Sequence, residues 1–122
     1  MSIEFEIVPE QQLIRVTCSG SLTQQGFRDY LERRDADPRF SLGFRRLMDA
    51  RGLLELPTAP GMRTFAEYLA TGNPQRVRIA FVATADAPYG MFRMAEIISE
   101  INGFEHRAFR TIREAETWLG LV

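Results

Sequence analysis

The seven residues VRIAFVA, at positions 77–83, limit the fold of this chain more than any other stretch. Apart from Arg78 they are all apolar, so a strand built from them needs cover on both of its faces. Strands of this kind lie in the middle of sheets that are packed between layers of other elements. VRIAFVA therefore predicts a central, buried strand.

Two earlier segments alternate apolar and polar residues, which is typical of strands with a buried face. In IEFEIV the apolar positions are Ile3, Phe5 and Ile7, and QLIRVTC shows a related pattern between Leu13 and Cys18. The intervening PEQQ is short enough for a hairpin connection. We therefore predict that these two strands pair in antiparallel fashion.

Helical spacing begins after Gly20. Phe27, Tyr30 and Leu31 share one side of LTQQGFRDYLERR, and DADPRF ends this helix because the residue before a proline avoids the α region. FRRLMDA then predicts a third strand. The LLELPTAPG link leads to a second helix, which TGNPQ ends and whose predicted core-facing stripe consists of Met62, Phe65, Ala66 and Leu69.

The central strand is followed by a third predicted helix, PYGMFRMAEIISEI, with NG as its stop, and then by a fifth strand, FEHRAF. A last helix is indicated by TIRE, where Thr111 caps and Glu114 reaches back as in a capping box. The order β-β-α-β-α-β-α-β-α predicts one α/β domain over residues 1–122. Its architecture is a sandwich with a mixed, mostly parallel five-stranded sheet, about four helices and an N-terminal β-hairpin.

Composition argues against several classes of protein. Fifteen basic and 16 acidic residues give a net charge of −1, which provides no broad attraction for nucleic acid or for an anionic membrane. No window approaches the roughly 18 apolar residues of a membrane span, and the acidic, alternating N-terminus is unlike a signal peptide, so we expect a cytoplasmic protein. One histidine and one cysteine cannot build a tetrahedral zinc site, and we expect neither a metal nor a cofactor.

The third predicted helix carries more apolar residues than one buried face needs. A coherent stripe, which we predict to face the core, consists of Met91, Met94, Ala95, Ile98 and Ile101. Phe92 and Ile97 lie on either side of it and widen the apolar arc to roughly 220°. The excess would be covered by the neighbouring helix, by a second subunit or by an apolar ligand.

Gly90 lies inside the same helix, where a glycine costs roughly 1 kcal/mol relative to alanine, though less in the first turn. Its presence suggests that something approaches the backbone closely. We expect this to be a strand or loop of the same chain. The second expectation is a ligand or partner backbone, with Tyr89 and Arg93 alongside.

Four polar residues lie near the carboxyl ends of two predicted strands: Asp49 and Arg51 at the third, and Thr84 and Asp86 at the fourth. Ligands of open α/β sheets usually bind at that edge, so these side chains could hold a small polar ligand. The alternative, which we favour, is that they satisfy backbone groups of the loops.

The remaining charged or reactive residues have simpler interpretations. A basic stretch, without the interleaved aromatic residues that would stack on bases, is predicted to form a solvated face and contains Arg45, Arg46, Arg51 and Arg63. His106 has no serine or cysteine close by in FEHRAF, and we interpret it as a structural histidine of a strand, with partners in space left open. Cys18 is predicted to be a small buried hydrophobe.

The element order, together with LMDARGLLELPTAPGM and APYGMFRMAE, resembles the STAS fold of anti-sigma-factor antagonists. The similarity is to the SpoIIAA-like branch, which includes many uncharacterised bacterial proteins. A YGMxRM-like helix start after the fourth strand and a C-terminal EAxxWL, here EAETWL, are familiar features of that branch. The resemblance covers almost the whole chain and implies a non-enzymatic protein that binds a protein partner.

Members of the STAS family resemble a switch that phosphorylation of a Ser or Thr turns off, at the start of the helix after the third strand. Aligning Asp49 with the first aspartate of the family's DxSxxxxMDSSG-like run places Thr58 beside that position. The resemblance thus implies Thr58 as a phospho-acceptor, and unpaired N–H groups at a helix start would favour a phosphate there. Judged from the residues alone, Thr58 is more simply a helix cap.

Two functions follow. The first is a non-catalytic STAS-like interaction or regulatory module that binds a protein partner or a second copy of itself, because the sequence shows no nucleophile–base pair, metal cluster or phosphate-binding glycine loop. The alternative is a carrier or sensor for a small apolar ligand, such as a lipid tail, near residues 88–97. The predicted surface for either comprises Asp49, Arg51, Thr84, Asp86, Tyr89, Gly90, Met91, Phe92 and Arg93. An enzyme that uses Asp49, Asp86 and His106 as acid and base ranks third.

Overall fold

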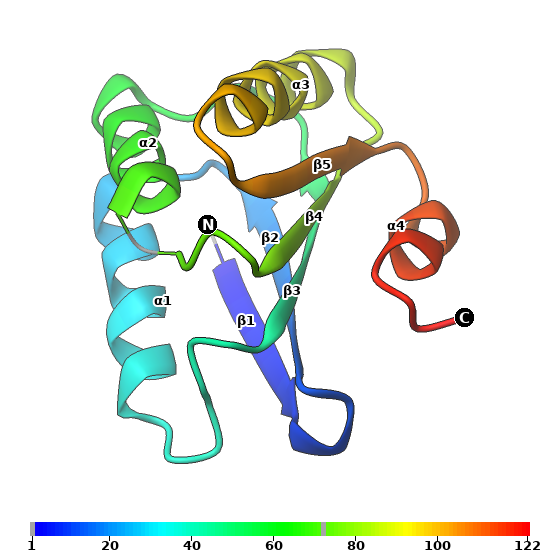
Figure 1. Cartoon of the computed structure of the whole chain (residues 1–122). Helices are drawn as coiled ribbons and strands as arrows, with labels where there is room; N and C mark the ends of the chain where they lie inside the picture. The colour runs from blue at the N-terminus through cyan, green and yellow to red at the C-terminus, as the bar shows by residue number, and fades with distance from the viewer. Residues whose placement is uncertain (1, 72) are drawn as a thin grey trace.

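The computed structural model describes residues 2–71 and 73–122, and within them five strands form one mixed sheet (Figure 1). The strands lie in chain order across the sheet: β1 (Ser2–Val8), β2 (Leu13–Gly20), β3 (Arg45–Leu53), β4 (Arg78–Val82) and β5 (Glu105–Phe109). The β1–β2 pair is antiparallel, and the three other pairs are parallel. The predicted hairpin and the mostly parallel five-stranded sheet are confirmed.

Helices cover both faces of this sheet. On one face lie α1 (Gln24–Ala36), α2 (Ala59–Thr71) and α3 (Asp86–Ile101), and on the other lies α4 (Ile112–Trp118) (Figure 1). A 3-10 turn, η1 (Pro9–Gln11), joins the first two strands. Every residue from Ile79 to Ala83 is buried, so the prediction of a central strand with cover on both faces is confirmed.

Local signals at the helix ends act as expected. The Thr111 hydroxyl accepts a hydrogen bond from the Glu114 N–H at 3.2 Å and donates one to the Glu114 carboxylate, which caps α4. Helix α1 ends at Ala36, immediately before the Asp37-Pro38 pair. Helix α2 ends at Thr71, where TGNPQ begins, although the glycine of this predicted break, residue 72, lies outside the described residues.

Aromatic rings dominate the larger core, which lies between the sheet and the three helices α1, α2 and α3. The Phe81 ring of β4 stacks on the Phe92 ring of α3, with centroids 4.8 Å apart and planes 6° from parallel. The Phe65 ring of α2 packs edge-on against Phe81, with centroids 5.6 Å apart. The Phe27 ring of α1 packs edge-on against Phe65, with centroids 6.0 Å apart. One aromatic chain therefore connects three helices to the central strand.

A smaller core lies beneath α4 on the opposite face, formed by Leu13, Leu47, Ala80, Val82, Ala115 and Leu119. Arginines of three strands fasten the helix through bonds from Arg15 to the Glu116 carboxylate (2.6 Å), from Arg45 to the Leu119 carbonyl and from Arg78 to the Trp118 carbonyl (2.6 Å). A helix of only two turns is thus held by polar contacts around its apolar seat.

The predicted core-facing stripe of α3 is correct for Ala95, which is buried, and for Met91, which packs against the larger core, but it is wrong for the other three residues. The buried residues are Pro88, Phe92, Ala95 and Ser99, whereas Met94, Ile98 and Ile101 of the predicted stripe are exposed. The stacking of Phe92 on Phe81 and the contact of Ser99 with His106 turn this other side toward the sheet. The larger apolar side chains are therefore left on the outside.

Helix α2 is rotated away from its predicted stripe in the same way. Phe65 is buried as expected, but Met62 and Ala66 are exposed, and the buried residues are Gly61, Thr64, Phe65 and Tyr68. Gly61 sets this orientation, because its Cα lies so near the backbone carbonyl of Leu22 that a side chain would not fit. The rotation places the outer apolar sides of α2 and α3 next to a common groove.

No helix in the described part of the chain is long and apolar enough to cross a membrane.

Candidate functional site: an apolar groove between α2 and α3

A groove of about 700 Å³ runs between α2 and α3. Its walls include Met62, Ala66 and Leu69 of α2 and Met91, Met94 and Ile98 of α3. Buried side chains, those of Phe65, Ala95 and Ser99, also line it. The volume lies within the range of small-molecule sites, and the lining is mainly apolar.

Small residues on the facing sides of the two helices leave this space open. They are Ala66 and Ala70 of α2 and Ala87, Gly90 and Ala95 of α3. Longer methionine side chains stand at the edges, and their flexible thioethers can adapt to different apolar partners. The small residues therefore leave an apolar groove at a place where two packed helices would ordinarily be in contact.

The apolar surface continues past the groove along α3. Ile97 and Ile101, which do not line the groove, are 47% and 80% exposed, next to Met94 at 59% and Ile98 at 54%. The spacing 94, 97, 98, 101 places these four residues on one side of the helix. A contiguous apolar face of this kind is unusual on a protein that has no binding partner.

Gly90 opens onto this groove and not toward its own chain. A Cβ atom added at Gly90 would meet no atom within 4 Å, so the expected close approach of a strand or loop is wrong. Of the predicted surface residues, Met91 lines the groove, whereas Phe92 is buried in the core. Arg93 points elsewhere and pairs with Glu96 at 2.7 Å.

A residue that the sequence did not single out, Arg110, gathers three predicted site residues. Its guanidinium donates to the Thr84 carbonyl at 2.7 Å and to the Asp86 carboxylate at 3.1 Å, and it lies 3.8 Å from the centroid of the Tyr89 ring. Asp86 does not cap α3, whose N-cap is Ala85 without a side-chain bond. The cluster ties the end of β4 and the start of α3 to the segment after β5, in agreement with a structural role.

Asp49 and Arg51, both within the second half of β3, pair with each other. Two hydrogen bonds of 2.9 Å join the guanidinium to the carboxylate, and these bonds lower the pKa of Asp49. Among the described residues no hydrogen bond or ion pair connects this pair with Thr84 or Asp86. The four polar residues therefore form two separate pairs of contacts and not one polar pocket.

Thr58 is the cap of α2. Its hydroxyl accepts a hydrogen bond from the Gly61 N–H at 3.1 Å, as the simpler interpretation of this residue predicted. The residue is exposed, and its role as a phospho-acceptor stays a prediction.

The fold brings Ser99 and His106 together, which sequence separation alone did not suggest. The Ser99 Oγ and His106 Nδ1 atoms lie 2.6 Å apart, and both residues are buried. Nε2 of His106 has no hydrogen-bond partner within residues 2–71 and 73–122. The Ser99–His106 contact joins α3 to β5, and the structural role of His106 stays a prediction.

Burial, together with the nearby Arg46 charge, lowers the pKa of His106 from 6.5 to about 4. The unfolded chain then binds a proton that the folded chain does not, so this contribution is complete above pH 6.5 and is lost as the pH falls toward 4. We expect the free energy of unfolding to drop by about 2–3 kcal/mol across that window because of His106. Urea unfolding of wild type and His106→Gln at several pH values measures it, and equal slopes for the two proteins would contradict the prediction.

The basic stretch does not form one solvated face. Arg51 and Arg63 are exposed and Arg45 is half-buried, but Arg46 is fully buried, so the prediction is wrong for Arg46. Arg46 shares a strand face with Met48 and Ala50, and this alternation was the signal that it points inward. Cys18 is buried as predicted, and burial raises the pKa of its thiol to about 12.

Within the described ranges no three His, Cys, Asp or Glu side chains are grouped so that they could hold a metal ion. Comparison of the chain with protein-family models, with curated proteins and with solved structures finds no match.

Proposed function

We propose that this chain is a non-catalytic, STAS-like protein-interaction module of the bacterial, cytoplasmic type. The observation that carries the proposal is the exposed apolar face of α3, residues Met94, Ile97, Ile98 and Ile101, beside the α2–α3 groove. A groove bordered by such a face matches the way in which proteins bind the apolar side of an amphipathic helix. Burial of this surface by a partner would remove an apolar patch from water.

The occupant that we propose is α3 of a second copy of the chain. This helix presents apolar residues at the spacing i, i+3, i+4 and i+7, which a groove of helix-binding type recognises. A two-fold arrangement would place the α3 face of each copy against the groove of the other, as closed homodimers require. Gly90 and the alanines of the groove would allow the incoming helix to approach closely.

Light scattering during size exclusion tests this proposal. We expect a mass of twice the 14.0 kDa chain at concentrations of about 100 µM, and a monomer for Ile98→Glu, because a carboxylate would be buried without a partner in the interface. The dissociation constant should rise by about 100-fold or more.

Leu42→Glu is the matched control, since Leu42 is 55% exposed, as Ile98 is at 54%, but belongs to the loop before β3. This variant should remain dimeric. A wild-type chain that stays monomeric at that concentration, or a loss of the dimer in both variants, would contradict the proposal.

A second candidate function is binding of a small apolar ligand, such as a lipid tail, in the groove. The specific observation that favours it is the size and apolar lining of the groove, about 700 Å³. A ligand in the groove would leave Ile97 and Ile101 exposed, which is why the protein partner ranks first. Native mass spectrometry of the same samples separates the two: a monomer with added mass supports the ligand, and a dimer of bare chains supports the interaction module.

A further inference from the structure

Two arginines are buried inside the larger core. Arg34 lies in the last turn of α1 and is 3% exposed, and Arg46 lies on the inner face of β3 and is 0% exposed. The Phe40 ring, from the loop between α1 and β3, covers both guanidinium groups at 4.6 and 5.6 Å. Arginine keeps its proton in proteins, so this core contains two positive charges.

Little negative charge balances them. Asp35 pairs with Arg34 at 3.0 Å, but the Asp35 side chain is 59% exposed, and it is the one carboxylate that pairs with either guanidinium in the described part of the chain. In the part of the chain that the structure describes, Arg46 donates one hydrogen bond, to the Leu42 carbonyl at 3.2 Å. An unpaired buried charge costs several kcal/mol, which a fold does not ordinarily carry without compensation.

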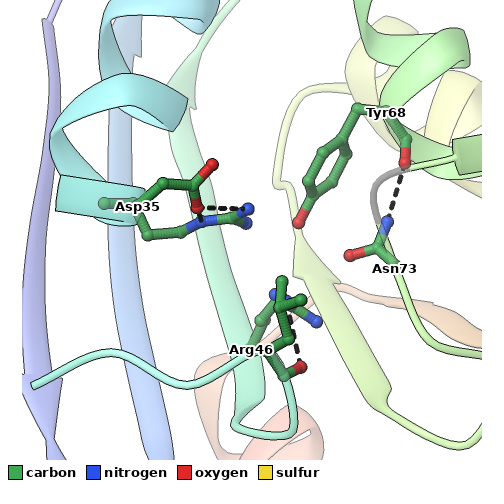
Figure 2. Close-up of polar contacts among 6 residues, drawn as sticks. Asp35, Arg46, Tyr68 and Asn73 are labelled. Carbon is green, nitrogen blue, oxygen red and sulfur yellow. Dashed lines mark hydrogen bonds and ion pairs between the residues drawn. The ribbon is translucent and has the colours of Figure 1, made fainter. Parts of the chain in front are cut away.

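The polar atoms around the two arginines are also unpaired. Within the described ranges no hydrogen-bond partner exists for Arg34 Nη1, Arg46 Nε and Nη1, the Tyr68 hydroxyl, Asn73 Oδ1 or His106 Nε2. The Tyr30 hydroxyl lies within hydrogen-bond reach of the Arg34 side chain. Figure 2 shows the Tyr68 hydroxyl, the Asn73 amide oxygen and the Arg46 head group turned toward one space, with Asp35 at its side. These atoms come from α1, α2, β3, β5 and the segment after α2.

We propose that this cluster is a binding site for a small oxyanion, of the phosphate or sulfate type, held between Arg34 and Arg46. Three of the unpaired nitrogen atoms belong to guanidinium groups and can only donate hydrogen bonds, and both tyrosine hydroxyls can donate as well. An oxyanion supplies several acceptor oxygens and negative charge together. Bound water could satisfy the hydrogen bonds, but it would add no negative charge beside Arg46, and Arg34 would keep only the exposed Asp35 as its counter-charge.

The enclosure of the site limits what it can take. Arg34, Arg46, Tyr30 and Tyr68 are each at most 3% exposed, so the anion would be surrounded by protein. Such an enclosure would admit a small free ion only, because an ester with a large substituent would need an opening. The site lies on the sheet side of α1 and α2 and is distinct from the α2–α3 groove, whose lining does not include these four residues.

Thermal unfolding in the presence of inorganic phosphate tests the site. Against sodium chloride of equal ionic strength, we expect about 10 mM phosphate to raise the Tm of the wild type by about 5–10 °C, as a ligand at roughly 100 times its Kd would. Sulfate should act similarly, and acetate, which offers two oxygens, less. Arg46→Met should abolish the shift, and Tyr68→Phe, which removes one hydroxyl and keeps the ring, should weaken phosphate binding by about 3–10-fold.

Arg28→Met is the matched control. This substitution also removes one arginine charge, but from the exposed side of α1, the helix that carries Arg34. This variant should keep the full phosphate response. The proposal is overturned if phosphate acts no differently from chloride, or if Arg46→Met and Tyr68→Phe respond as the wild type does. Should Arg46→Met fail to fold, Tyr68→Phe and a direct calorimetric titration of wild type with phosphate decide the question.

Discussion

Replacing Phe81 by alanine is expected to lower the free energy of unfolding by about 3–5 kcal/mol, the largest loss of any single truncation in this chain. Phe81 is 0% exposed and lies at the centre of the aromatic cluster, stacked on Phe92 at 4.8 Å and edge-on to Phe65 at 5.6 Å. Truncation would remove the ring contacts of α2 and α3 with the central strand together. The cavity that is left could close only if both helices moved.

Urea unfolding followed by circular dichroism measures this loss. Phe44→Ala is a suitable control, since the Phe44 ring is half-buried and contacts Phe40 at 6.1 Å, outside the central cluster. For Phe44→Ala the free energy of unfolding should fall by about 1–2 kcal/mol, because a half-buried ring buries less apolar surface on folding. Similar losses for the two variants would show that the cluster around Phe81 does not dominate the stability.

The second large effect is expected for Gly61→Ala, which should destabilise the chain by about 2–3 kcal/mol even though alanine is the better helix former. A Cβ atom at Gly61 would lie 2.5 Å from the backbone carbonyl oxygen of Leu22 and 3.1 Å from the Thr58 hydroxyl. A backbone carbonyl cannot swing aside as the end of a long side chain can, so α2 would have to move from its seat.

Gly90→Ala is the matched comparison, because it makes the same change in a neighbouring helix where a Cβ atom meets nothing within 4 Å. At low concentration, where the chain is monomeric, this variant should be more stable than wild type by about 0.5–1 kcal/mol. The two glycines should thus give shifts of opposite sign in thermal or urea unfolding. A neutral or stabilising Gly61→Ala would contradict the close contact between α2 and the segment before α1.

Much of the fold was predictable because its signals are local. The apolar run of β4, the alternation in β1 and β2, the proline after Asp37 and the cap at Thr111 each depend on a few neighbouring residues. The order of strands and helices then leaves few arrangements, since parallel strands need crossovers and antiparallel neighbours need short turns. The element order and the pairing directions followed from these features.

The rotation of α2 and α3 was not predictable from spacing. Periodicity identifies an apolar side of a helix, but α3 has apolar residues over more than one side, and only contacts in three dimensions decide which side meets the sheet. Phe92 lies at the edge of the predicted stripe, but in the structure it stacks on Phe81 and lies at the centre of the buried side of α3. Gly90 and Met91 belonged to the predicted surface and do line the groove, but Met62 and Ala66, which also line it, were assigned to the core.

The buried cluster of Arg34 and Arg46 was missed for a different reason. A charged side chain is almost always a surface residue, so sequence reasoning assigns arginine to solvent unless the strand parity is given more weight. Burial of these two arginines depends on Phe40, Tyr30 and Tyr68, which come from three separate segments. The i, i+4 spacing of Tyr30 and Arg34 in α1 is local, but no local pattern could have brought Phe40 and Tyr68 to them.

Helix α4 is the last element along the chain, and this position affects the order in which the domain can fold during synthesis. The strands and the three helices of the opposite face all precede α4 along the chain, so they leave the ribosome earlier and can assemble first. Until α4 arrives, Leu47, Ala80 and Val82 have no cover on its side of the sheet. Before α4 packs, these apolar side chains of the nascent protein are exposed and can associate with other chains. Packing of α4 buries them.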